Sequence, residues 1–83
     1  MESIIVELYI PAISATFDFR LPASARVCDV TDEIIRILEA TQQNLRFDKE
    51  LPMLCDVSSG RALNPAAYIA ETGVRDSSRL MLV

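Results

Sequence analysis

Two runs near the N-terminus alternate apolar and polar positions in the way that is typical of β-strands. The apolar residues of each run share one face at a period of two residues: Ile4, Val6, Leu8 and Ile10 in residues 4–10, and Phe17, Phe19 and Leu21 in residues 15–21. The segment between them contains Pro11, which cannot donate a hydrogen bond to a sheet ladder. The pattern therefore predicts a β-hairpin with a strongly apolar inner face.

The period changes to that of a helix from about Val27. The residues that follow the i, i+3, i+4, i+7 rule are Val27, Val30, Ile34, Ile37, Leu38 and Thr41. Ser24 is a candidate N-cap, and Asp29 and Asp32 place negative charge near the positive end of the helix dipole. We expect a helix that fades around Gln42 and covers the apolar face of the hairpin.

The middle of the chain predicts a polar connection and two further strands. Residues 44–50 are polar apart from Leu45 and Phe47, which we expect to anchor the connection to the core. Residues 51–57 are a third strand candidate, and residues 61–63 are a short fourth.

The C-terminal third predicts a short helix and a closing strand. Asn64-Pro65 is a helix start signal, and Gly73 suits the left-handed position after a helix, so we expect one or two helical turns over residues 66–71. Residues 79–83 form the last strand. Gly60 and Gly73 are the positions at which a positive φ is expected.

The order of elements predicts one α+β domain over residues 1–83. A mixed four- to five-stranded sheet, with one long helix packed on one face and a short helix before the last strand, is the β-grasp arrangement. The first and last strands are the most apolar, so we expect them to be central.

The chain also resembles a known family. Gly60-Arg61-x-Leu63 and the later Gly73-Val74-x-Asp76-x-Ser78-x-Leu80-x-Leu82 are similar to the C-terminal half of ubiquitin-like domains. Thr16-Phe17-Asp18-Phe19-Arg20-Leu21-Pro22-Ala23, followed by a Val/Ile helix, resembles the YukD/EsaB family. These are small bacterial ubiquitin-like proteins associated with type VII (ESX-type) secretion systems.

The resemblance implies a cytoplasmic accessory or regulatory component that binds a type VII secretion subunit or a regulator without being conjugated to it. Family members are not enzymes, and no catalytic motif carries over, so the resemblance assigns no site residue. The sequence ends at Val83 without a Gly-Gly pair, which covalent tagging requires, and this favours non-covalent binding. The alternatives are a ubiquitin-like modifier or sulfur-carrier protein, or a generic homodimeric β-grasp adaptor.

The composition of the chain limits which classes of partner are expected. The net charge of −4, with the arginines scattered singly, disfavours nucleic acid and anionic membrane surfaces. No stretch approaches the length of a membrane span, and the N-terminus lacks the features of a signal peptide, so a cytoplasmic location without membrane insertion is expected.

Catalytic, metal and cofactor chemistry find little support in the sequence. There is no histidine, so the commonest general base is missing and a cysteine nucleophile would lack its usual partner. Cys28 and Cys55 match no metal or redox spacing, and we expect both to be reduced packing residues, with Cys55 facing the core beside Met53 and Val57. Asp29, Asp32 and Glu33 are interpreted as a solvated helix start, since no glycine-bearing acidic loop is present. We expect no enzyme activity and no cofactor.

The alternation of the strands predicts one candidate binding surface. If Ile4, Val6 and Leu8 point at the helix, their neighbours point away from it. Asp56 is expected to face solvent, which would place Leu54 on the same outer face. The predicted protein-binding residues are Ile5, Tyr9, Leu54, Met81 and Val83. A homodimeric contact and scattered, covered residues are the alternatives for this surface.

Overall fold

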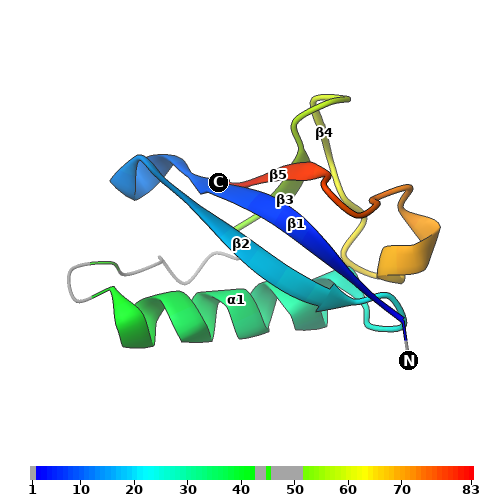
Figure 1. The fold of residues 1–83 in the computed structure, drawn as a ribbon, viewed down its shortest axis with the longest axis horizontal. Helices are drawn as coiled ribbons and strands as arrows, with labels where there is room; N and C mark the ends of the chain where they lie inside the picture. Colours follow the sequence, from blue (N-terminus) through cyan, green and yellow to red (C-terminus); the bar gives the residue numbers. More distant parts are fainter. Residues whose placement is uncertain (1, 43–44, 46–51) are drawn as a thin grey trace.

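The computed structural model describes residues 2–42, 45 and 52–83, and it contains the predicted mixed sheet and long helix (Figure 1). In chain order the elements are β1 (Ser3–Ile10), the 3₁₀ turn η1 (Pro11–Ile13), β2 (Ala15–Pro22), α1 (Val27–Thr41), β3 (Leu54–Asp56), β4 (Arg61–Ala62), the 3₁₀ turn η2 (Ile69–Glu71) and β5 (Arg79–Leu82). The five strands form one sheet in the order β2-β1-β5-β3-β4. The β-grasp prediction is confirmed, as is the central position of the first and last strands.

The predicted N-terminal hairpin is formed by β1 and β2. β1 and β2 pair antiparallel from Ser3 opposite Pro22 to Ile10 opposite Ala15. β5 lies parallel to β1 on its other side, with Leu8 opposite Leu80. β5 in turn pairs antiparallel with β3. The two most apolar strands therefore occupy the middle of the sheet, where both of their edges are paired.

Helix α1 begins at Val27 without the predicted cap from Ser24. Arg26 precedes the helix with an extended backbone and gives no side-chain cap. The N–H groups of Val27 and Cys28 instead donate to the carbonyl oxygens of Ala67 (2.9 Å) and Pro65 (3.0 Å). A loop distant in sequence thus satisfies two of the N–H groups that every helix start leaves unpaired.

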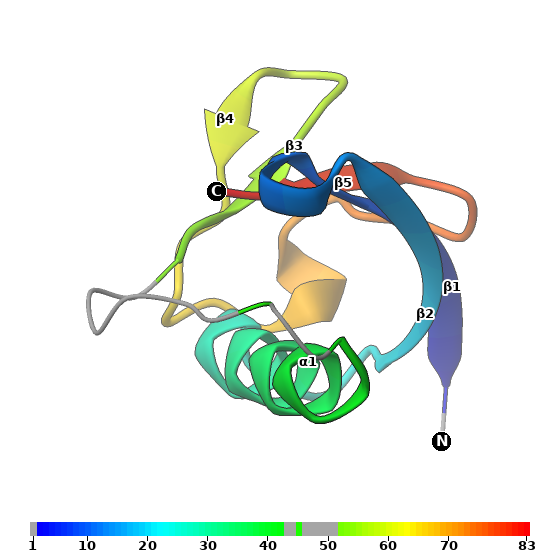
Figure 2. The ribbon, with the colours of Figure 1, turned by 90° about the vertical axis from the view of Figure 1, so that its left-hand side faces the viewer.

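The core lies between α1 and one face of the sheet (Figure 2). The helix contributes the stripe Val27, Val30, Thr31, Ile34 and Leu38. The strands contribute the residues of the opposite layer: Val6, Leu8, Ile10, Leu21, Leu54, Leu80 and Leu82. Leu45, from the connection after the helix, is also buried as predicted, while Phe47 and Leu51 lie outside the described residues.

The C-terminal half departs from the predictions in two places. β3 is described over Leu54–Asp56, within the predicted range 51–57. Asn64-Pro65 does not start a helix. The N–H of Ala66 donates to the Asn64 side chain and the N–H of Ala67 donates to the Asn64 carbonyl oxygen, both at 3.0 Å, so these residues form a local turn. The predicted short helix is reduced to the single 3₁₀ turn η2. Gly60 (φ 70°) and Gly73 (φ 83°) adopt the positive φ values that were predicted.

Candidate functional site

The sheet has one face against α1 and an opposite face, here called the outer face, that no described helix covers (Figure 2). One row of cross-strand partners defines the middle of this face. Tyr9 of β1 lies opposite Met81 of β5, and Met81 lies opposite Cys55 of β3. Directly opposite residues project to the same side of a sheet, so these three side chains lie next to one another.

A second apolar pair extends this row. Met53 and Val83 exchange backbone hydrogen bonds in both directions, with N···O distances of 2.7 and 3.0 Å. Their side chains are 52% and 58% exposed, and Tyr9 is 39% exposed. We call Tyr9, Met53, Cys55, Met81 and Val83 the apolar patch. Large apolar side chains gathered on an uncovered face are typical of a contact surface.

Leu54, which was predicted for this face, does not belong to it. Leu54 is 2% exposed and lies in the core, opposite Leu82 of β5. Cys55 was predicted to face the core, and this too is wrong, because it shares the outer face with Met81. The assignment of inward and outward residues in the third strand is therefore shifted by one position.

The misplacement has a local cause at Asp56. The charge of Asp56 suggested an outward side chain, but Asp56 lies opposite Leu80, on the helix side at the end of the strand. Its carboxylate accepts hydrogen bonds from the N–H of Ser58 and the hydroxyl of Ser59, both at 3.2 Å. The sequence signal was the run Asp56-Val57-Ser58-Ser59-Gly60, which is typical of a turn whose first residue supplies the cap.

A charged row separates Ile5 from the apolar patch. Glu7 of β1 lies opposite both Asp18 of β2 and Arg79 of β5. Ile5 is exposed on the far side of this row, where its N–H donates to Asp76 (2.7 Å). Of the five predicted residues, the structure brings Tyr9, Met81 and Val83 together and places Ile5 apart from them. Met53 and Cys55 complete the group and were missed.

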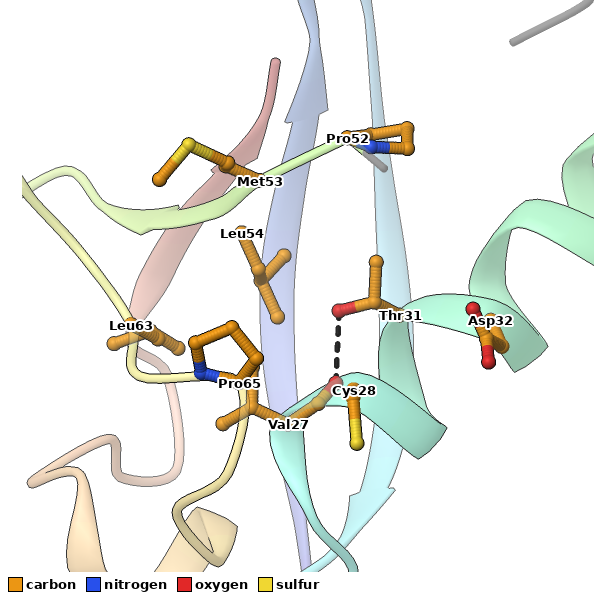
Figure 3. A pocket seen from close by; sticks show the side chains of 9 residues that line it. All are labelled: Val27, Cys28, Thr31, Asp32, Pro52, Met53, Leu54, Leu63 and Pro65. Carbon is orange, nitrogen blue, oxygen red and sulfur yellow. Dashed lines mark hydrogen bonds between the residues drawn. The ribbon is translucent and has the colours of Figure 1, made fainter. Parts of the chain in front are cut away.

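A hollow of about 120 Å³ lies between the start of α1 and β3 (Figure 3). Its lining is mostly apolar and consists of Val27, Cys28, Thr31, Asp32, Pro52, Met53, Leu54, Leu63 and Pro65. The Thr31 hydroxyl donates to the carbonyl oxygen of Val27 (2.8 Å). The thiol of Cys28 lies 3.9 Å from Asp29 Oδ1. The cavity thus offers an apolar recess and few polar groups.

Arg26 and Tyr68 hold the η2 segment against the start of the helix. The two residues form an antiparallel bridge, and the guanidinium lies 5.1 Å from the centre of the Tyr68 ring. The guanidinium also donates to the Tyr68 hydroxyl (3.3 Å), which raises the pKa of Arg26 above its ordinary value. An arginine is protonated at neutral pH in any case, so the contact fixes geometry.

The described residues bring no three His, Cys, Asp or Glu side chains together in a way that could hold a metal ion. Cys28 and Cys55 are both free thiols, and both are half-buried. Among the described residues, no helix is long and apolar enough to cross a membrane.

Comparison with known proteins places the fold. No protein-family model matches the sequence, and no curated protein matches it. Among solved structures, the EccD5 ubiquitin-like domain from Mycobacterium xenopi has a TM-score of 0.83 at 20% identity, covering 100% of this chain and 94% of that one. The chain is therefore similar in fold to ubiquitin-like domains.

Two further structures show how widely this fold is used. A chain of the MycP5-free ESX-5 inner membrane complex has a TM-score of 0.83 at 20% identity, and the match covers all of this chain and 21% of that one. A chain of a toluene 4-monooxygenase complex has a TM-score of 0.81 at 10% identity, covering 99% and 98% of the two chains. The shared ubiquitin-like fold thus occurs in proteins of different function, which leaves function to the site.

Proposed function

We propose that this domain is a non-enzymatic protein-binding module of a type VII secretion system, acting on the cytoplasmic side as a YukD/EsaB-like accessory or regulatory component. It binds a protein subunit of the apparatus non-covalently through the apolar patch. Support for the secretion system comes from the likeness in fold to the EccD5 domain and to a chain of the ESX-5 inner membrane complex.

The observation that carries the binding role is the row Tyr9, Met81 and Cys55, extended by Met53 and Val83. Three strands supply this row, so the backbone beneath it is held by hydrogen bonds on both sides. A pre-formed apolar surface loses little conformational freedom on binding. Methionine adapts its shape to a partner, and tyrosine combines an apolar ring with a polar hydroxyl.

The test is binding of the purified domain to a detergent-solubilised type VII inner-membrane complex from the source organism. The double variant Met53→Asp/Val83→Asp places two charges on the patch at exposed positions, so the domain stays folded. We expect binding to weaken by about tenfold or more, as for loss of a central contact in an interface.

The matched control is Ile37→Asp, which changes an exposed apolar residue of α1 in the other layer. This variant should bind as the unmodified domain does. Equal binding by the double variant and the unmodified domain would refute the patch. Failure of the unmodified domain to bind the complex at all would refute the link to secretion.

A further inference from the structure

Strand β2 forms one edge of the sheet and pairs with β1 alone among the described strands. The N–H of Ala23 donates to the carbonyl oxygen of Glu2 (3.0 Å) at the end of the β1–β2 ladder. In an antiparallel ladder the bonded pairs alternate, so the odd-numbered residues of β2 direct their backbone groups to β1. Thr16, Asp18 and Arg20 therefore direct theirs to the free edge.

The exposed side chains along this edge include two charged residues, Asp18 and Arg20, and neither lies opposite a residue of opposite charge on β1. Asp18 lies opposite Glu7 in a pair that is not hydrogen-bonded, where side chains are closest, and like charges in such a pair are unfavourable. The row of cross-strand partners Asp18, Glu7 and Arg79 thus contains two carboxylates and one guanidinium, and the guanidinium lies on the side of Glu7 away from Asp18. Arg20 lies opposite the apolar Ile5.

The helix side of the same edge is apolar and incompletely covered. Phe17 and Phe19 are half-buried, with their rings edge-to-face and 6.4 Å apart. A groove of about 260 Å³ runs between β2 and α1, and the exposed Ile37 lies on its helix wall. The edge thus combines unpaired backbone groups, an apolar flank and two opposite charges.

We propose that β2 pairs with β2 of a second copy of this chain, antiparallel and about a two-fold axis at Phe19, to form one continuous sheet. In this register Asp18 lies opposite Arg20 of the second copy. Both residues have outward backbone groups, so each donates its N–H to the carbonyl oxygen of the other. Thr16 donates in the same way to the carbonyl oxygen of Pro22 of the second copy.

The charges select this register over its neighbours. A two-fold axis at Asp18 would set two aspartates opposite each other, and an axis at Arg20 would set two arginines opposite each other. With the axis at Phe19, each Asp18 gains a guanidinium on the side away from Glu7. The like-charge pair within one chain is thereby compensated by the other chain.

The apolar side chains on the helix side also match in this register. Phe19 meets Phe19 of the second copy, and Phe17 meets Leu21, in pairs where the two strands are closest. The contact is small, so we expect a weak dimer that depends on concentration. The apolar patch lies on the outer face and stays open, so this inference is independent of the proposed function.

The test is the dissociation constant of the dimer, measured by analytical ultracentrifugation over a concentration series. Asp18→Arg and Arg20→Asp each place like charges opposite one another and should weaken the dimer by about tenfold or more. The double variant Asp18→Arg/Arg20→Asp restores opposite charges and should recover the dimer. Arg75→Asp makes the same charge change at an exposed position outside the strands and should have no effect.

A second measurement identifies the interface itself. Amide hydrogen exchange of Thr16, Asp18 and Arg20 should slow as concentration rises, because their N–H groups become bonded. A chain that stays monomeric over the whole series would overturn the proposal. So would a double variant that fails to recover the dimer, or a dimer whose three amides exchange freely, since that dimer would use another surface.

Discussion

Both faces of the sheet carry apolar side chains, but only one face is buried. On β1, Leu8 is fully buried under α1, while its neighbour Tyr9 is 39% exposed on the outer face. On β5, Leu80 and Leu82 are buried, while Met81 between them faces outward. The comparison teaches that apolar character alone does not make a face into core. The position of the helix decides which face is sealed, and the other remains available for a partner.

The largest expected effect is on stability and comes from Leu54, the buried residue that was predicted to face outward. Leu54→Ala should lower the free energy of unfolding by about 2–5 kcal/mol, because it removes a buried side chain and leaves a cavity. Met53→Ala changes the adjacent outward residue and should cost within about 0.5 kcal/mol. Urea unfolding of the two variants measures the difference. Equal losses would mean that the two positions do not occupy different environments.

An intermediate effect tests the centre of the open face. Alkylation of Cys55 by N-ethylmaleimide in the Cys28→Ser variant adds bulk beside Met81, and we expect about tenfold weaker binding to the type VII complex. The matched control is the Cys55→Ser variant, in which Cys28 is the thiol that reacts. Since Cys28 lies at the start of α1, its alkylation should leave binding unchanged. The reverse result would move the binding surface to the hollow of Figure 3.

The smallest expected effect concerns the charged row that borders the apolar patch on the outer face. Asp18→Asn removes the like-charge pair with Glu7, so the free energy of unfolding of the monomer should rise by about 0.2–1 kcal/mol. The measurement uses urea unfolding at low protein concentration, where self-pairing of β2 does not contribute. The gain should shrink in high salt, which screens exposed charges. A loss of stability would show that Asp18 makes a favourable contact within one chain.

Much of the fold could be predicted because its signals are long and local. Eight paired residues on each strand of the hairpin and a helix of four turns give many apolar positions that agree with one period. Val27, Val30, Ile34 and Leu38 of the helix stripe are buried as the spacing predicts. Ile37 and Thr41, which were predicted for the same stripe, are exposed. The positive φ values at Gly60 and Gly73 also follow from residue type, since glycine adopts them at little cost.

Only part of the candidate site could be predicted, because the pattern of the third strand is short and ambiguous. Tyr9 and Met81 lie on strands in which a charged residue, Glu7 or Arg79, marks the outward positions, and both face outward. In the third strand candidate, Met53, Leu54, Cys55 and Val57 supply apolar residues at both parities, so the pattern does not say which set is inside. The charge of Asp56 then favoured the wrong choice, because its role as a turn cap depends on the residues after it.

The sequence by itself determined that the chain forms a hairpin, a long helix and a closing apolar strand, because each pattern repeats often enough to outweigh local exceptions. Tertiary structure decided the inward side of β3, because this short strand takes its orientation from its ladder with β5. It also decided where α1 begins, because carbonyl oxygens of Pro65 and Ala67, far along the chain, accept the hydrogen bonds of its first N–H groups. Interactions of this kind depend on elements that meet only when the chain has folded.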